Sequence, residues 1–207
     1  HRDLRRQRQM CIRDRIKKVD PIIKVKNKIK KIVLEGGAID VNGKGSVILT
    51  RECLLSKVQE RNPGISKLNL ENSLRKYLNV KNFIWLNKGI EGDDTHGHVD
   101  DIARFVSPNT IMTGVEKNKK DKNFKILREN LKILKKSKNI DGKKFRIIQI
   151  PMPKAIYINK VKVPASYLNF YIANKIILLP FFNDEHDKMV FSIFKRFFKK
   201  RKIIPIN

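Results

Sequence analysis

Five carboxylates and two histidines fall within eleven consecutive residues, EGDDTHGHVDD, at positions 91 to 101. The chain around them is strongly basic, with a formal net charge of +27 and only four histidines in 207 residues. Clustered carboxylate and imidazole groups can bind a metal ion, or can hold and act on an organic cation. A solvated acidic loop is a third interpretation, but it gives no role to two histidines set among glycines.

The metal interpretation rests on the order of His96, His98, Asp100 and Asp101. This H-x-H-x-D-D pattern is close to the H-x-H-x-D-H pattern of metallo-hydrolases, whose histidines bind zinc. The final histidine is missing, and outside the N-terminal segment only His186 is left as a further histidine ligand. A metal-dependent hydrolase that uses His96, His98 and Asp100 is therefore one alternative function.

The cation interpretation places His98 and Asp100 on the same side of an extended segment, because alternate side chains of a strand share a face. A buried carboxylate there needs a cation, and a planar guanidinium is its best geometric partner. Such a site would bind a guanidino compound directly and would need no metal.

Composition limits the class of protein. The chain is long enough for one domain with a substantial core, and hydrophobic residues make up 41% of it. It has no apolar run of transmembrane length and no visible signal peptide, so no membrane partner is expected. Its two cysteines, Cys11 and Cys53, do not suggest a disulfide framework, which favours a cytoplasmic location.

The basic charge raises nucleic acid as a partner, since the pI is near 10.3. Lysine is spread evenly among Ile and Asn, and the chain has no RRM-type aromatic motif, zinc-finger spacing or helix-turn-helix signature. The basic run FKKRKII, residues 198–204, is the main support for a nucleic-acid-binding protein, which stays an alternative. We expect no nucleic-acid partner.

The first fifteen residues, HRDLRRQRQMCIRDR, differ from everything that follows. They have neither strand nor helix periodicity, and RQRQMCIRDR resembles the translation of a sequencing-library adapter. We therefore expect residues 1–15 to be a non-native segment, with a genuine basic arm as the alternative. The catalytic domain is then expected to occupy residues 16–207.

After this segment, short β-rich runs alternate with amphipathic helices. The run 31–41 predicts two strands separated by a Gly-Gly break, and Asn42-Gly43 predicts a hairpin. Asn183 or Asp184 is expected to cap the last helix. Helices are expected at 66–78, 121–137 and 184–198, and further strands at 82–86, 102–106, 109–115, 144–150, 159–174 and 175–182.

Apolar stripes identify the helix faces that should be buried, such as Leu70, Leu74, Tyr77 and Leu78 on the first helix. Strand-rich segments followed by one helix recur at intervals of roughly 55 residues, which predicts a repeated ββαβ-like unit in an α/β protein. Units of that size pack around an axis, where their loops converge to form a site. Short βα units in an open α/β sheet are the alternative.

Several segments, taken in their order along the chain, resemble the agmatine deiminase family, which is related to the bacterial type of peptidylarginine deiminase. They are IVLEGGAIDVNGKGSVILT (32–50), RECLLS (51–56), RNPG (61–64), IWLNKGIEGDDTHGHVDDIARFV (84–106) and VPASYLNFYIAN (163–174). The resemblance implies a pentein-type α/β propeller of repeated ββαβ units around a pseudo-fivefold axis. This chain would hold about three of the five units.

The resemblance also implies a hydrolase that uses no cofactor and no metal. Members of the family hydrolyse the guanidinium of agmatine to N-carbamoylputrescine and ammonia, a step in putrescine and polyamine biosynthesis. In the family a cysteine thiolate attacks the central guanidinium carbon and forms a covalent thiouronium intermediate. The expected partner is therefore a small guanidino molecule, and a homo-oligomer is compatible with the family.

The resemblance assigns roles to the residues that match the family pattern. His98 is expected to be the acid/base that protonates the departing ammonia and then activates water. Glu35 should orient His98, and Asp100 should hold the guanidinium through paired charge-assisted hydrogen bonds. Asp94 should meet the primary amine at the far end of the substrate, and Asn169 should line the same pocket.

Other residues near these are expected to be structural. Asp93 and Asp101 should support the site, and His96 should act as local scaffolding. Cys53 belongs to the RECLLS segment, which is distinct from the family's nucleophile, so it should be a packed core thiol. Trp85 should also lie in the core.

Two parts of the family pattern do not occur in residues 1–207. An upstream R-D-x-G-P motif supplies a second aspartate for the guanidinium. The nucleophilic cysteine ends a Gly-rich turn, N-I-H-C, near the family's C-terminus. We therefore expect an internal fragment, truncated at both ends and catalytically inactive, of a protein that is itself an active agmatine deiminase.

Overall fold

The computed structural model describes residues 32–207. The chain divides into two compact units, His1–Val33 and Leu34–Asn207, and the second carries all the helices and strands described below. The expected non-native segment, residues 1–15, lies outside the described residues. None of the helices in 32–207 has the length and apolar character that a membrane crossing requires.

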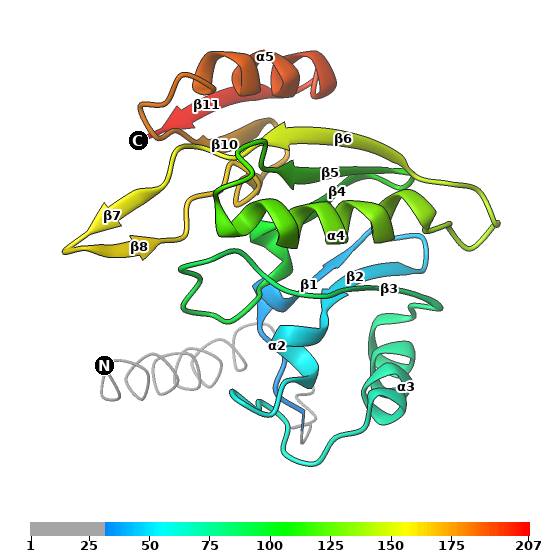
Figure 1. Cartoon of the computed structure of the whole chain (residues 1–207). Helices are drawn as coiled ribbons and strands as arrows, with labels where there is room; N and C mark the ends of the chain where they lie inside the picture. Colours follow the sequence, from blue (N-terminus) through cyan, green and yellow to red (C-terminus); the bar gives the residue numbers. More distant parts are fainter. Residues whose placement is uncertain (1–31) are drawn as a thin grey trace, which may run out of the picture. The chain divides into compact units, whose positions relative to one another are not determined.

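The first repeat is a three-stranded sheet in which two helices, the short α2 (Arg51–Leu55) and a longer one, connect the last two strands (Figure 1). Its first two strands form an antiparallel hairpin, and its third strand joins the second in parallel. Asn42 closes the hairpin because its Oδ1 accepts hydrogen bonds from the backbone N–H groups of Lys44 and Ser46. This confirms the predicted Asn-Gly hairpin. The elements are β1 (Ile39–Val41), β2 (Ser46–Thr50), α3 (Lys67–Leu78) and β3 (Asn82–Leu86).

The same order of strand, strand, helix and strand occurs twice more. In each copy the first pair of strands is antiparallel and the last pair is parallel. These separate sheets confirm the predicted ββαβ repeat and argue against one open sheet. The second copy is β4 (Ala103–Ser107), β5 (Thr110–Val115), α4 (Lys122–Lys136) and β6 (Arg146–Pro151). The third copy is β9 (Tyr171–Ile172), β10 (Ile176–Pro180), α5 (Asp187–Phe197) and β11 (Lys202–Ile206).

The prediction of one long strand over 159–174 is wrong. Part of this segment belongs to a separate antiparallel hairpin, and the chain then leaves any sheet until Tyr171. Pro164 has no backbone N–H to donate to a neighbouring strand. The Ser166 hydroxyl then accepts a hydrogen bond from the Leu168 N–H, which makes a turn. The strands of the hairpin are β7 (Ile156–Ile158) and β8 (Val161–Val163).

Two short helices lie in segments that the sequence described differently. The Gly-Gly break predicted within 31–41 lies in the 3-10 helix η1 (Gly36–Ala38), the predicted second strand begins at Ile39, and residues 32–35 form no strand. Residues Val99–Asp101 form the 3-10 helix η2, where an extended segment was expected. Both short helices directly follow residues of the candidate site.

Helix α5 begins at Asp187, and the expected caps Asn183 and Asp184 do not occupy its N-cap position. That position belongs to His186, whose side chain makes no capping hydrogen bond. Asp184 instead uses its Oδ1 to accept the His186 backbone N–H at 2.8 Å. The Asp187 carboxylate accepts the Tyr167 hydroxyl at 2.5 Å, which ties the start of the helix to the buried segment before β9.

The helices bury their predicted stripes to different extents. On α3, Leu70 and Leu74 are buried, whereas Tyr77 and Leu78 are 49% and 40% exposed, so that stripe is only half correct. Helix α4 contacts both β3 and β5 and thereby joins the first and second repeats in one core. The buried apolar residues of α4 and α5 are Leu127, Leu134, Val190 and Phe194.

Candidate active site

Glu35 and His98 meet across 63 residues of sequence, as the family resemblance implied. His98 Nε2 lies 2.8 Å from Glu35 Oε2, and the histidine side chain is 14% exposed. Glu35 directly precedes η1 and His98 directly precedes η2. The two short helices are in contact, so the fold brings the two side chains together from consecutive repeats.

The second glycine of the LEGG segment makes this approach possible. A Cβ atom on Gly37 would lie 2.4 Å from His98 Nδ1 and 2.7 Å from Asp100 Oδ2. A Cβ atom on Gly36 would meet nothing within 4 Å. Position 37 therefore accepts only glycine unless the His98 or Asp100 side chain moves. The sequence pattern predicted the Gly-Gly pair only as a break between strands, so this role was missed.

The Glu35–His98 contact favours the charged form of both side chains. The hydrogen bond from His98, together with Arg61, lowers the pKa of Glu35, although partial burial opposes the change. Burial alone would lower the pKa of His98, but the nearby carboxylates of Glu35, Asp100 and Asp93 outweigh it and raise this pKa above its ordinary value of 6.5. An imidazole can both donate and accept a proton, and the nearby carboxylates favour its protonated form.

Asp93 organises the loop that carries His98. Its Oδ2 accepts the backbone N–H groups of Gly97 at 2.7 Å and of His98 at 3.0 Å. Its Oδ1 accepts the backbone N–H of Thr95 at 2.8 Å. Gly97 has a φ of 93°, which favours glycine. These contacts fit the structural role predicted for Asp93.

Asp100 provides an unused acceptor beside His98. Its Oδ1 lies 4.0 Å from His98 Nδ1, is buried, and has no hydrogen-bond partner among residues 32–207. Burial raises the pKa of Asp100, and the charges of His98 and Arg104 only partly offset this. A buried carboxylate oxygen without a partner is costly, so a bound cation would stabilise it. We call Glu35, His98 and Asp100 the acid/base cluster.

The other predicted binding residues lie outside the contacts of this cluster. Asn169 is exposed, and its Nδ2 donates to Asp101 Oδ1 at 3.0 Å. Burial raises the pKa of Asp101 to about 6. Asp94 is exposed, and within the described range no hydrogen bond joins its carboxylate to Glu35 or His98. The fold thus assembles the acid/base cluster, whereas the side-chain hydrogen bond of Asn169 goes to Asp101, outside the cluster.

Cys53 is a buried thiol, as predicted. It lies in helix α2 (Arg51–Leu55), is 1% exposed, and has its Sγ 4.0 Å from Glu35 Oε2. Burial raises the pKa of Cys53 to about 12. At neutral pH this thiol is therefore protonated and a poor nucleophile.

The side chains of Glu35, Cys53 and His98 offer ligand atoms that all lie within 4.8 Å of one another. A carboxylate, a thiolate and an imidazole are suitable zinc ligands at such separations. The Arg61 guanidinium, however, already lies 2.7 Å from Glu35 Oε2 and supplies a positive charge to that oxygen. A metal ion would have to displace this arginine, which disfavours a metal at this position.

The metal set suggested by the sequence, His96, His98 and Asp100, does not form a ligand group within residues 32–207. His96 has a left-handed backbone with a φ of 56°, and its Nδ1 lies 3.2 Å from the carbonyl oxygen of Asp94. Its ring therefore takes part in the local turn, in keeping with the scaffolding role predicted for it.

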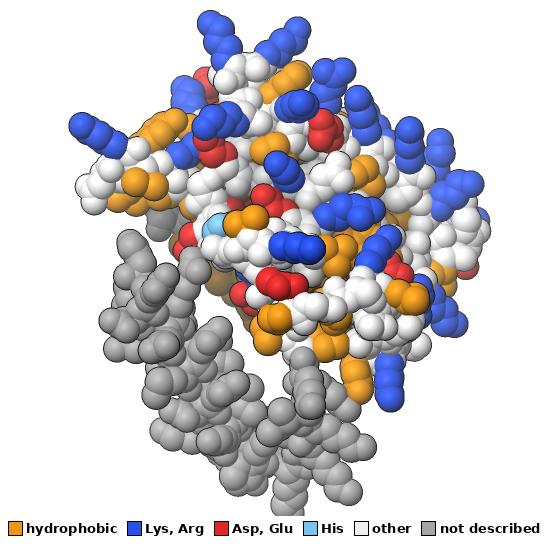
Figure 2. Space-filling view, turned by 60° about the horizontal axis from the view of Figure 1, so that its bottom comes forward, with side chains coloured by type: hydrophobic (Ala, Val, Ile, Leu, Met, Phe, Trp, Pro, Cys, Tyr) orange, Lys and Arg blue, Asp and Glu red, His pale blue; other side chains and the backbone are white. Residues whose placement is uncertain are grey.

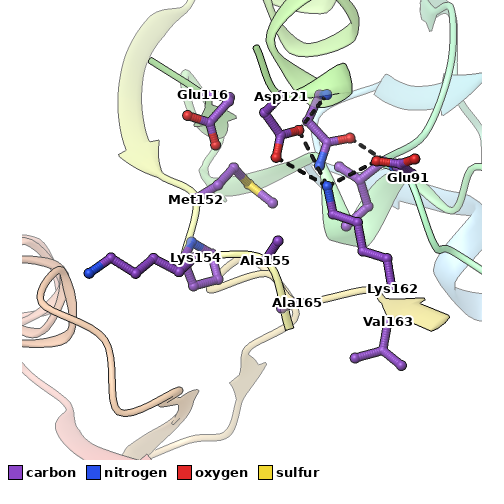
Figure 3. A pocket seen from close by; sticks show the side chains of 12 residues that line it. Glu91, Glu116, Asp121, Met152, Lys154, Ala155, Lys162, Val163 and Ala165 are labelled. Atoms are coloured by element: carbon purple, nitrogen blue, oxygen red, sulfur yellow. Dashed lines mark hydrogen bonds and ion pairs between the residues drawn. The ribbon is translucent and has the colours of Figure 1, made fainter. Parts of the chain in front are cut away.

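A second cluster, which we call the Lys162 clasp, comprises Lys162, Glu91 and Asp121 (Figure 3). Lys162 on β8 places its Nζ 3.0 Å from Glu91 Oε2 and 3.1 Å from Asp121 Oδ2. Lys122 adds a 2.6 Å contact to Glu91 Oε1. Gly92 lies directly against β8, since a Cβ there would be 2.6 Å from the Lys162 carbonyl oxygen. The clasp therefore fixes the start of the acidic segment to the β7–β8 hairpin and to the start of α4.

Basic side chains do not gather into one patch on the face shown in Figure 2. Lysine and arginine are scattered over it, with acidic and apolar side chains between them. This distribution outlines no groove of one charge that could follow a nucleic-acid backbone. The net charge of +27 belongs to the whole chain. The mixture of charges on this face agrees with a lysine-rich composition and not with one basic binding site.

A family model described as Porphyromonas-type peptidyl-arginine deiminase matches residues 4–207 of the chain. A Legionella pneumophila relative is 39% identical over 177 residues, which cover 85% of this chain and 50% of the relative. An agmatine deiminase from Medicago truncatula is 32% identical over 211 residues, which cover 92% of this chain and 56% of that protein. The chain thus spans about half the length of the curated relatives it matches.

Solved structures agree with the sequence comparisons. A cysteine-to-serine variant of C. jejuni agmatine deiminase, with substrate bound, matches with a TM-score of 0.84 at 31% identity and covers 92% of this chain and 56% of its own. An agmatine deiminase of Enterococcus faecalis matches with a TM-score of 0.83 at 29% identity, covering 92% and 57%. These similarities confirm the expected pentein-type fold. Together with the family model, they show that this chain belongs to the Porphyromonas-type peptidyl-arginine deiminase family.

Proposed function

We propose that this chain contributes the guanidinium-binding and acid/base part of an agmatine deiminase. The observation that carries the proposal is the 2.8 Å contact of Glu35 with His98 beside Asp100, whose buried Oδ1 has no hydrogen-bond partner in the described range. A buried acceptor for a cation, next to a histidine that can exchange a proton, suits a reaction on a guanidinium. Relatives from Medicago truncatula and Enterococcus faecalis are named agmatine deiminases, which supports the same substrate.

In the proposed reaction, Asp100 accepts hydrogen bonds from the guanidinium nitrogens and fixes the plane of the group. A thiolate attacks the central carbon, and His98 in its protonated form gives a proton to the departing ammonia. The neutral imidazole then takes a proton from water, which attacks the thiouronium carbon and releases N-carbamoylputrescine and the thiolate. Glu35 stabilises the imidazolium during the first step and orients the ring in the second.

The proposal takes the nucleophile from outside residues 1–207. Cys53 is unsuited because burial raises its pKa to about 12, and Cys11 lies outside the described residues. The family resemblance assigns the nucleophile to a cysteine in an N-I-H-C motif that these residues do not contain. Residues 1–207 alone should therefore be inactive, and turnover should need the full-length gene product.

Asp94 carries the choice of substrate in this proposal. Agmatine has an ammonium group at the end opposite its guanidinium, whereas arginine also has a carboxylate there. The exposed Asp94 carboxylate would attract the ammonium group of agmatine and repel the carboxylate of arginine. Asn169 is proposed to contribute to the same pocket. We further propose that the enzyme is cytoplasmic, acts in putrescine biosynthesis and assembles as a homo-oligomer.

The test uses the full-length gene product, whose ends are first confirmed by sequencing the source DNA. Incubation with agmatine should release ammonia and N-carbamoylputrescine in equal amounts, and arginine should react much more slowly. Thiol alkylation should abolish turnover, and chelators should leave it unchanged. His98→Gln should lower kcat by about 10²–10⁴-fold. Activity that is lost with a chelator would instead favour the metal-dependent hydrolase. Salt-sensitive binding of nucleic acid without turnover would favour the nucleic-acid-binding protein.

A further inference from the structure

Arg61 is a buried cation that the roles assigned from the sequence did not include. It follows α2 in the RNPG segment, and its side chain is only 11% exposed. Its Nε donates to Glu35 Oε2 at 2.7 Å, and its Nη1 donates to the Cys53 carbonyl oxygen at 3.3 Å. Its Nη2 donates to the carbonyl oxygen of Thr95, in the acidic loop. One guanidinium thus links η1, α2 and the loop that carries His98.

Arg61 and His98 contact the same atom. Both Arg61 Nε and His98 Nε2 lie within hydrogen-bond distance of Glu35 Oε2, at 2.7 and 2.8 Å. A carboxylate oxygen that accepts from two donors divides its negative charge between them. The arginine is permanently charged, so the attraction that Glu35 exerts on the His98 proton depends on whether Arg61 is present.

We propose that Arg61 is a positioning residue that fixes the Glu35 carboxylate for His98 and limits how strongly Glu35 retains the His98 proton. The inference rests on the proposed function, because it assigns Arg61 a task in acid/base chemistry. Arg61 would act through Glu35, and no contact with substrate is needed. The fork geometry of arginine suits this task, since one side chain reaches the carboxylate and the backbone carbonyls of Cys53, Gln59 and Thr95 together.

The other charges around His98 act mainly in the opposite direction. Glu35 precedes η1, Asp93 organises the loop and Asp100 lies on η2. These three carboxylates favour the imidazolium form of His98. Arg61 instead places a positive charge on Glu35 Oε2, the oxygen closest to His98 Nε2, and so opposes the effect of these carboxylates on the His98 proton. The charged and titratable groups that face the histidine in the described range are Glu35, Glu52, Cys53, Arg61, Asp93, Asp100, Asp101 and, through Asp100, Arg104.

The direct test measures the His98 pKa by NMR titration of its ring protons in the 207-residue chain. Arg61→Gln should raise this pKa by about one unit, because the shared oxygen then acts on His98 alone. The control is Arg75→Gln, which removes the same charge from a surface pair with Glu71, at 3.2 Å and 42% exposed. Equal His98 pKa values in the wild type and both variants would overturn the proposal.

A second measurement needs no variant and so does not depend on how well one folds. The Arg61 Nε–H resonance of the unmodified chain should shift with pH at the same midpoint as His98, because both donors share Glu35 Oε2. A resonance that does not change through that range would refute the shared contact.

Kinetics of the full-length gene product separate this inference from the proposed function. With agmatine, Arg61→Gln should move the acidic limb of the kcat profile to higher pH, which lowers kcat by up to about tenfold along that limb. The KM should change little, and Arg61→Lys should restore part of the rate. A shift in the NMR titration without any agmatine turnover would refute the proposed function but not the shared carboxylate. Agmatine turnover with an unchanged pH profile would refute the role of Arg61.

Discussion

In the Lys162 clasp both carboxylates have a cation, whereas in the acid/base cluster one carboxylate oxygen has none. Lys162 holds Glu91 and Asp121 together, and Lys122 takes the remaining oxygen of Glu91. Hydrogen bonds from Lys122 and Lys162 lower the pKa of Glu91. The clasp is therefore electrostatically satisfied, and its charges have no need of a ligand.

The acid/base cluster uses the same kinds of side chain and is left incomplete. Glu35 has both Arg61 and His98, but Asp100 keeps a buried oxygen without a partner in the described range, and burial raises its pKa. Closed ion pairs hold a fold together, whereas an open, buried acceptor reduces stability until a ligand binds. The comparison thus separates a cluster whose charges are paired and support the loop from a cluster with a buried acceptor that is open to a ligand.

Among the changes that compare the two clusters, the largest effect is expected at Gly37. In Gly37→Ala the new Cβ would lie 2.4 Å from His98 Nδ1, so the cluster must move apart. We expect kcat/KM for agmatine in the full-length gene product to fall about a hundredfold. Gly36→Ala is the matched control, because a Cβ there meets nothing within 4 Å. Similar kinetics for the two variants would show that the close packing at position 37 is not needed.

Asp100→Asn should separate binding from stability. Replacing the carboxylate removes a charge-assisted contact with the guanidinium, so KM for agmatine should rise about 10- to 100-fold. The melting temperature of the 207-residue chain should stay the same or rise, because an unpartnered buried charge is lost. Asp121→Asn in the clasp is the counterpart and should lower the melting temperature. A lower melting temperature for Asp100→Asn would mean that Asp100 is a structural residue.

Lys162→Met should weaken the clasp without changing the chemistry. Its side chain is 13% exposed and holds two carboxylates, so the free energy of unfolding should fall by about 1–2 kcal/mol. Denaturant unfolding of the 207-residue chain measures this loss. Lys154→Met is the control, since its pair with Glu185 is 73% and 65% exposed and should contribute little. Equal losses in both variants would remove the distinction between the clasp and a surface pair.

The smallest effect expected is the pH dependence of stability that arises from the Glu35–His98 contact. The pKa of Glu35 is lowered from 4.5, so its contribution is lost as pH falls through the folded value. The pKa of His98 is raised from 6.5, so its contribution is complete below 6.5 and is lost as pH rises through the folded value. The stability difference between wild type and His98→Gln should therefore be larger at about pH 5.5 than at about pH 8.5.

Denaturant unfolding at these two pH values provides the test. The clasp supplies the contrast, because the pKa of Glu91 is lowered from 4.5 and that of Lys162 is raised from 10.5, so both stay charged between these two pH values. Stability curves for wild type and His98→Gln that run parallel from pH 5.5 to 8.5 would contradict the proposed coupling between Glu35 and His98.

Much of the repeat could be predicted from local patterns, and the errors have local causes. Asn42-Gly43 predicted the first hairpin because its turn depends on neighbouring residues only. The strand predicted over 159–174 failed at Pro164, which cannot donate to a ladder. Tyr77 and Leu78 are on the predicted face of α3 but lie too near its end to be covered.

The contacts of the site were predicted only where the family resemblance supplied them. The Glu35–His98 contact followed from matching motifs, since no local pattern links residues 63 apart. Arg61 and Gly37 lie in segments that match the family, RNPG and LEGG. Their roles were still missed, because the role of a single arginine or glycine depends on which residues surround it in the fold. The sequence placed His98 and Asp100 together correctly, although on a strand where the structure has η2.

The separation of Glu35 and His98 along the chain also orders events during protein synthesis. At about 5–20 residues per second, a ribosome makes Glu35 roughly 3–13 seconds before His98. The β1–β2 hairpin can form during that interval because it needs only adjacent residues. Arg61 is made in the same interval and can reach Glu35 first. The nascent carboxylate can thus gain a cationic partner before its histidine leaves the ribosome.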